Sequence, residues 1–248
     1  MRKSQINIFL ILGAFIVVVF GVATYTTTKI TEKRADNELS NIALSPGQIA
    51  PVTTYTENLL YTLSEEALFN EVGAVEHAHL LSLDEMKNIL IDYIKNNFNS
   101  ELDLSEFESS GMEISKQDIG NVDVNINPND VTVTLEYPWA IKLNNIKNTI
   151  YDFKTILFVR LGLVYNISAY LADKINNEGA PLNPYVLKPE DCAYISNIGG
   201  QDSSGLDYVE ATINSGVITI TDRYTEKFYF QKPFTFKFGI ANVNDGSC

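Results

Sequence analysis

The chain is poor in the residues from which catalytic and metal centres are most often built. Its 248 residues include only two histidines, two cysteines and one tryptophan. It contains no G-x-S-x-G motif of serine hydrolases, and its glycine-rich stretch 199–205 lacks the lysine of a phosphate-binding loop. These absences favour a protein that is not an enzyme and that carries no cofactor.

Basic residues are also in the minority. Lysine and arginine number 18 against 31 aspartates and glutamates, which gives a formal net charge of −13. The first 35 residues have a basic excess, so the acidic excess lies in the remainder. Because an acidic surface repels nucleic-acid phosphates and anionic lipid headgroups, we expect no nucleic acid among the partners.

A long apolar run occurs once, from Ile6 to about Tyr25, directly after a basic stub at residues 1–5. About 20 residues at roughly 1.5 Å rise each match the roughly 30 Å hydrocarbon core of a bilayer. The run therefore predicts a single transmembrane helix at 6–25, in contact with membrane lipid or with neighbouring copies. We expect the short N-terminus inside the cell membrane and the large C-terminal part outside it.

Three hypotheses for the fate of this run remain open. A signal-anchor would stay in place, whereas a secretory signal would be cut near the small residues 21–23. A leader resembling that of type IV pilins would be cut at Ser4-Gln5, in front of the apolar run. Phe9 occupies the position at which many pilins have a glutamate.

The remainder predicts a stalk at 26–47 and one extracytoplasmic α+β domain at 48–248. Ser45-Pro46-Gly47 is expected to end the stalk. Three amphipathic helices are expected at 51–73, 82–98 and 161–178; Ser82 and Glu85 form a capping-box pattern for the second. Period-two alternation predicts an antiparallel sheet, with strands near 122–126, 131–137, 149–158, 208–213, 217–221 and 228–240. Pro138-Trp139 is expected to end the first hairpin, and 181–189 to be irregular.

This order of segments resembles uncharacterised single-pass surface proteins of small-genome archaea. The similar stretches are the anchor 5–20, Ile49–Tyr55 at the start of the first helix, Val131–Pro138, Phe153–Tyr165 and the closing Phe234–Ile240. The chain departs from the family where it has Leu59 or Leu60 in place of a cysteine, and Val75-Glu76-His77 in place of a Gln-Gly-Gly turn. The resemblance implies an anchored extracytoplasmic domain and implies no reaction.

The two histidines, His77 and His79, form the first candidate metal site. Two residues that are two apart share one face of a strand but point to different sides of a helix. Zinc needs three or four ligands, so Glu71, Asp84 or Glu85 would have to complete the set. A polar turn between two helices is the simpler interpretation of this segment.

A second candidate metal site is an oxygen-rich stretch that begins at Asp123. It resembles a calcium-binding loop in composition, with Asn125, Asn127, Asn129 and Asp130. Counted from Asp123, however, Pro128 and Thr134 replace the glycine and the glutamate that an EF-hand loop requires. The solvent-facing side of a hairpin explains the pattern better, and no metal is expected.

Three further features concern surface chemistry. Cys192 and Cys248 are candidates for one disulfide in an oxidising compartment, with two free thiols as the alternative. Asn166 begins an Asn-Ile-Ser glycosylation pattern, although it falls on a predicted helix. Trp139 and the tyrosines either pack in the core or form a carbohydrate or partner surface.

Together these features predict a non-enzymatic, membrane-anchored structural protein of the cell surface. Its expected form is a pilin-like filament subunit or an adhesin, which works as a homo-oligomer or within a surface assembly. The alternative from a different class is an anchored binding module for a small solute, a glycan or a cation.

Overall fold

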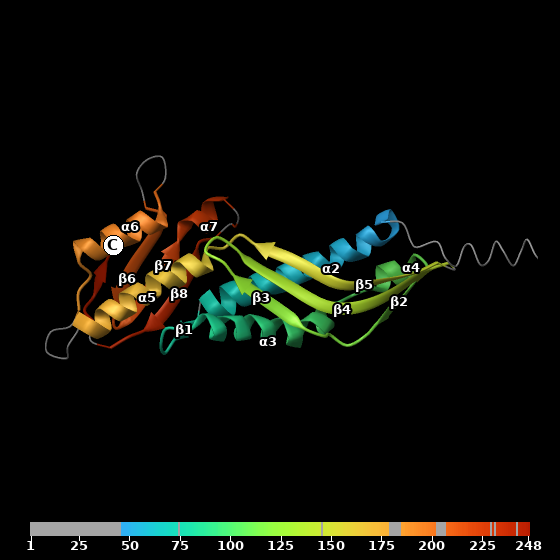
Figure 1. The fold of residues 1–248 in the computed structure, drawn as a ribbon, viewed down its shortest axis with the longest axis horizontal. Coiled ribbons are helices and arrows are strands. Elements are labelled where there is room, and N and C mark those ends of the chain that lie inside the picture. The colour runs from blue at the N-terminus through green and yellow to red at the C-terminus, as the bar shows by residue number, and fades with distance from the viewer. Residues whose placement is uncertain are drawn as a thin grey trace, which may run out of the picture.

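The computed structural model describes residues 46–248, except 74, 145, 179–184, 202–206, 229, 231 and 242. The predicted transmembrane segment 6–25, the candidate cleavage residues Ser4 and Gln5, and most of the predicted stalk lie outside the described residues. Among the helices that are described, none combines the length and the apolar character needed to cross a bilayer. The architecture is α+β, as predicted, and the molecule is elongated, with two lobes along its length (Figure 1).

The first lobe packs two long helices against one face of an antiparallel sheet. Its elements are α2 (Pro46–Glu66), η1 (Ala67–Gly73), α3 (Leu83–Glu101), α4 (Ser105–Ser109), β2 (Met112–Lys116), β3 (Val122–Ile126), β4 (Val131–Leu143) and β5 (Ile146–Leu157). β5 pairs with β4 along nearly its whole length, and β2 and β3 share the other edge of β4. α2 packs mainly against β5 and α3 against β3, which leaves the opposite face of this sheet uncovered by the described helices.

Strict alternation along β4 makes this arrangement stable. Every second side chain from Val131 to Ile141 is buried, and the intervening ones lie on the outer face. Tyr137, Trp139 and Phe153 form a chain of tilted and edge-to-face aromatic contacts beneath the helices, with Phe98 of α3 at one end. The Tyr137 hydroxyl donates to the side-chain oxygen of Asn99 at 2.8 Å, which fixes α3 over the sheet.

The second lobe has a mixed five-stranded sheet in the order β1-β8-β7-β6-β9. Its elements are β1 (Glu76–His77), α5 (Leu161–Glu178), α6 (Pro189–Gly199), β6 (Val209–Asn214), β7 (Val217–Asp222), α7 (Arg223–Phe228), β8 (Phe234–Gly239) and β9 (Gly246–Ser247). α5 and α6 pack together and cover β7 and β6. Both edges of this sheet are covered by strands of two residues, and such short strands offer little template for pairing with another chain.

Two glycines allow the lobes to approach closely. A Cβ on Gly162 of α5 would lie 2.6 Å from the carbonyl oxygen of Asn127 in the β3–β4 turn. A Cβ on Gly73 of η1 would lie 2.7 Å from the carbonyl oxygen of Thr235 in β8. Since real Cβ atoms do not make such contacts, each glycine is required for backbone of one lobe to rest on backbone of the other.

Two predicted boundaries in the first lobe are wrong. The helix expected to begin at Pro51 begins at Pro46 instead, so Pro51 lies inside α2. Pro46 suits a first helical turn, because its missing N–H would have no intrahelical partner there. β4 continues through Pro138 and Trp139 instead of ending there. A β-bulge lies at this point, between Glu136 and Trp139, and the Pro138 carbonyl accepts the N–H of Gln117 at 3.1 Å.

The second lobe contains helices that the sequence did not predict. α6 follows the irregular stretch, with Pro189 at its start and two acidic residues in its first turn. The strand expected at 228–240 is shorter, because α7 takes Arg223–Phe228 and β8 begins at Phe234. The helices expected at 82–98 and 161–178 are present as α3 and α5, and Ser82 and Glu85 form the predicted capping box.

Candidate functional site

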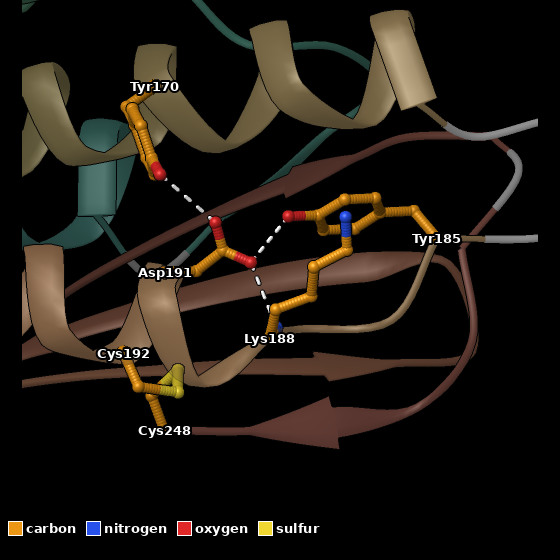
Figure 2. Close-up of a disulfide and its surroundings, with 6 residues drawn as sticks. All are labelled: Tyr170, Tyr185, Lys188, Asp191, Cys192 and Cys248. Carbon is orange, nitrogen blue, oxygen red and sulfur yellow. Dashed lines mark hydrogen bonds between the residues drawn. A yellow bond between two sulfur atoms is a disulfide. The ribbon is translucent and has the colours of Figure 1, made fainter.

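A buried carboxylate lies beside the C-terminus of the chain. Asp191 occupies the third position of α6 and has no exposed surface. Its Oδ2 accepts hydrogen bonds from the Lys188 backbone N–H at 2.9 Å and from the Tyr185 hydroxyl, and its Oδ1 accepts the Tyr170 hydroxyl at 3.1 Å (Figure 2). This carboxylate therefore joins α5, α6 and the segment that precedes α6.

The two tyrosines that donate to Asp191 are held in the protonated form. Burial is the main cause that raises the pKa of Tyr185 far above its ordinary value, and the bond to Asp191 adds to it. The same two causes, in the same order, raise the pKa of Tyr170. Each protonated hydroxyl donates to the buried carboxylate, so the two bonds hold α5 and the segment before α6 to Asp191.

The predicted cysteine pair lies next to this network. The structure joins Cys192 of α6 to Cys248 at the end of the chain, with 2.07 Å between the sulfur atoms (Figure 2). The Cys248 N–H also donates to the Ala211 carbonyl of β6 at 2.8 Å. The disulfide thus ties β9 against the edge of the second-lobe sheet.

A buried ion pair forms a second polar network in this lobe. Arg160, directly before α5, donates through Nε to Oδ2 of Asp222 at 3.1 Å and through Nη2 to its Oδ1. Its Nη1 donates to the Gly199 carbonyl at 2.8 Å, and its guanidinium stacks over the Tyr224 ring at 4.4 Å. The Thr225 hydroxyl also donates to Asp222 at 2.8 Å, and the two buried charges are paired with each other within the fold.

The structure does not bring the two histidines together as metal ligands. His77 lies in β1, with Nε2 2.9 Å from the Val72 carbonyl oxygen, whereas His79 Nε2 lies 3.5 Å from Oε1 of Glu85. Glu85 is already engaged in the cap of α3, where hydrogen bonds from Ser82 lower its pKa. Within the described part of the chain, no three His, Cys, Asp or Glu side chains are placed to hold a metal ion.

Asp123 lies on the outer face of the first-lobe sheet, as the hairpin interpretation predicts. It is paired across the strands with Thr134 and is exposed. The adjoining turn is closed by its own bonds, since Asn127 donates its backbone N–H to the Asp130 carbonyl and its Nδ2 to Asp130 Oδ1, each at 2.9 Å. The turn thus uses its oxygen atoms internally rather than presenting them together.

The glycosylation pattern lies in the middle of α5. Asn166 is exposed, but the Ser168 hydroxyl is fully buried and donates to the Val164 carbonyl at 2.8 Å. The acceptor pattern is therefore accessible as a whole only in a chain that has not yet folded.

Trp139 is a core residue and not part of a surface. It has no exposed area, and its indole Nε1 has no hydrogen-bond partner among the described residues. The exposed aromatic residue of this sheet is Tyr151, which is 60% exposed and lies opposite the bulge in β4. The sequence alone could not show that Trp139 is buried and Tyr151 exposed, because the bulge changes which β5 side chains face outward.

Tyr151 borders a hollow of about 340 Å³ on the outer face of the sheet, which we call the outer hollow. Its floor consists of Pro138 and Ala140 of the central strand β4. Polar side chains flank these two residues on both neighbouring strands. They are Ser115 and Gln117 on the β2 side, and Lys147, Thr149 and Tyr151 on β5.

Comparison of the chain with protein-family models, curated proteins and solved structures finds no match. The functional argument therefore rests on two features of the described structure. These are the disulfide-closed second lobe and the outer hollow of the first.

Proposed function

We propose that the chain is a non-enzymatic structural protein of the cell surface, anchored by residues 6–25. The single observation that carries this proposal is the disulfide between Cys192 and Cys248. Such cross-links persist in oxidising compartments outside the cytosol. The predicted transmembrane run and the acidic domain behind it agree with that placement.

The shape of the molecule supports presentation away from a membrane. α2 begins at one end of the long axis, and the lobe with the disulfide and the C-terminus occupies the other end (Figure 1). A membrane helix that precedes α2 would enter at the first end, so the second lobe would project outward. In a pilin-like filament the same apolar helix would pack against neighbouring copies, and in an adhesin it would stay in the bilayer.

Intact mass of the native protein, isolated from cell membranes, tests the anchoring proposal. Alkylation before reduction is expected to leave both cysteines unlabelled, and alkylation after reduction to label both. The N-terminal mass then separates the three hypotheses: loss of residues 1–4, loss up to about Ala23, or neither. Recovery from the cytosol with two free thiols would refute the proposal.

Negative-stain microscopy of surface appendages tests the filament form. Filaments that react with an antibody against the second lobe are expected if copies assemble through 6–25. Dispersed monomers in detergent, with no labelled appendage on cells, would reject the filament and leave the adhesin.

A second candidate, the binding module of a different class, is favoured by the outer hollow. Of the ligands considered, a cation is the least suited, because no carboxylate lines the hollow.

A further inference from the structure

We propose that the outer hollow binds a pyranose residue of a glycan. This inference deepens the binding-module candidate and does not depend on membrane anchoring. It rests on the shape of the hollow, on the chemistry of its walls, and on polar side chains that the fold leaves without partners.

The shape follows from the register of three strands. Ala140 lies between Ser115 of β2 and Thr149 of β5, so a methyl group separates two hydroxyl-bearing side chains. In the adjacent row, Pro138 bonds through its carbonyl to Gln117 and lies next to Tyr151 across the bulge. The short side chain of Ala140 lies near the longer Gln117 and Tyr151, which leaves a depression. Its volume falls near the lower end of the roughly 300–1,000 Å³ typical of small-molecule sites.

The walls of the hollow carry hydrogen-bonding side chains that have no partner within the described chain. The side chains of Ser115, Gln117, Lys147, Thr149 and Tyr151 make no hydrogen bond or ion pair with any residue that the structure describes. The next row of the same face shows the contrast, because Lys142 is bound to Glu113 at 2.9 Å. The hollow therefore presents two hydroxyls, an amide, an ammonium group and a phenol around one small floor.

This set of groups matches a sugar better than other ligands. One face of a pyranose ring carries C–H groups that pack on an aromatic ring, and its edge carries hydroxyls that both donate and accept. Tyr151 supplies the ring, and the hydroxyl and amide side chains supply donors and acceptors. A metal ion would need carboxylates, which are absent from the lining, and a phosphate would find a single lysine.

Lys147 lies at one end of the hollow, and its ammonium group indicates which groups of the sugar it would contact. It lies opposite Lys142 across the strands, but only Lys142 has a carboxylate partner. Its ammonium group is therefore available either to a ring hydroxyl or to the carboxylate of an acidic sugar. A neutral sugar and an acidic sugar would therefore use the same site, and the experiment below distinguishes them.

Ligand-observed saturation-transfer NMR on the full-length protein tests the proposal. The protein is held in a detergent without a sugar headgroup, since glycoside detergents would compete for the site. The probes are cellobiose, mannobiose, galactobiose and digalacturonic acid. Binding of at least one disaccharide is expected, and a uronate preference that Lys147→Gln abolishes would assign the carboxylate to Lys147.

Matched variants on the same face of the sheet provide the controls. Tyr151→Ala removes the ring and Ala140→Phe fills the floor, and each is expected to weaken binding at least tenfold. Ile156→Ala is the control for Tyr151, because Ile156 is 40% exposed on the same strand outside the hollow. Lys154→Gln is the control for Lys147, since Lys154 is also an exposed lysine of β5.

The outcomes separate clearly. Binding that is lost in Tyr151→Ala and Ala140→Phe but kept in Ile156→Ala and Lys154→Gln supports the site, whether the ligand is neutral or acidic. Failure of all four disaccharides to bind overturns it, as does binding that both hollow variants retain. Thermal unfolding of each variant confirms that it is folded, and the anchoring proposal is judged separately by membrane recovery and thiol labelling.

Discussion

The two lobes are stabilised by different kinds of interaction. In the first lobe the buried side chains are apolar or carry a hydroxyl, and the aromatic residues around Trp139 form its centre. In the second lobe the core also contains Arg160, Asp191 and Asp222, which are the buried charged side chains among the described residues. The second lobe has the disulfide as well.

This difference in stabilisation gives the two lobes different surfaces and different rigidity. Apolar packing on one face of a sheet leaves the other face free, and the outer hollow of the first lobe lies on that free face. Buried charges and a disulfide instead fix the positions of α5, α6 and the last strand against one another. We infer that the first lobe provides a surface and the second a rigid end.

The largest expected effect concerns the core of the first lobe. Trp139→Ala should reduce the free energy of unfolding by about 3–5 kcal/mol, because it empties a fully buried site. Trp139→Phe should cost much less, since the phenyl ring refills much of the site and the indole N–H that both variants remove has no partner within the described chain. Urea denaturation of the full chain measures both, and equal losses would contradict the packing role assigned to Trp139.

The next effect tests the buried charges of the second lobe. Asp222→Asn should cost about 3 kcal/mol, because it leaves the Arg160 charge buried without its counter-charge. Glu113→Gln is the matched control: it breaks the exposed pair with Lys142 and should cost less than about 1 kcal/mol. The double variant Arg160→Met/Asp222→Leu should recover much of the loss, and a loss in Asp222→Asn no larger than in the control would refute the argument.

The same contrast explains which parts of the molecule the sequence could predict. Alternation along β4 and the capping box at Ser82 are local patterns, so the first-lobe hairpin and α3 were predicted correctly. The networks of Arg160 and Asp222 join residues that are far apart in the chain, and no local pattern indicates such a pair. Asp191 is an intermediate case, because Pro189 and the acidic residues after it were a helix-start signal that went unused.

Of the candidate functional features, the disulfide could be predicted from the sequence and the outer hollow could not. The cysteine pair was the one available in this sequence, so a disulfide between Cys192 and Cys248 needed only a favourable distance. The outer hollow depends on the register of three strands and on the bulge beside Tyr151. A shift of one residue would turn these side chains to the opposite face. The sequence alone therefore left Trp139 and the tyrosines with the same two alternatives, core packing or a surface.

Removing the disulfide should affect the second lobe alone. The double variant Cys192→Ser/Cys248→Ser removes the cross-link between two positions that are 56 apart in the sequence. We expect it to lower the free energy of unfolding by about 2–4 kcal/mol. Amide hydrogen exchange should accelerate in β9, α6 and the adjoining β6, and stay unchanged in β3, β4 and α3. Faster exchange throughout both lobes would mean that the lobes unfold as one unit and would weaken the comparison.

The smallest expected effect concerns the tyrosines that donate to Asp191. The raised pKa of Tyr185 and of Tyr170 means that their contribution is complete below the unfolded pKa of about 10 and is lost as the pH rises above it. Tyr185→Phe should therefore cost about 1–2 kcal/mol at neutral pH, by removing a hydrogen bond to a buried carboxylate, and should flatten the decline of stability above about pH 10. Urea midpoints between pH 7 and 11 measure both effects, with the exposed Tyr151→Phe as control, for which a change below about 0.5 kcal/mol is expected. If Tyr185→Phe lost stability above pH 10 as steeply as the unmodified chain, the alkaline sensitivity would originate elsewhere, and the buried polar network would not distinguish the second lobe in this respect.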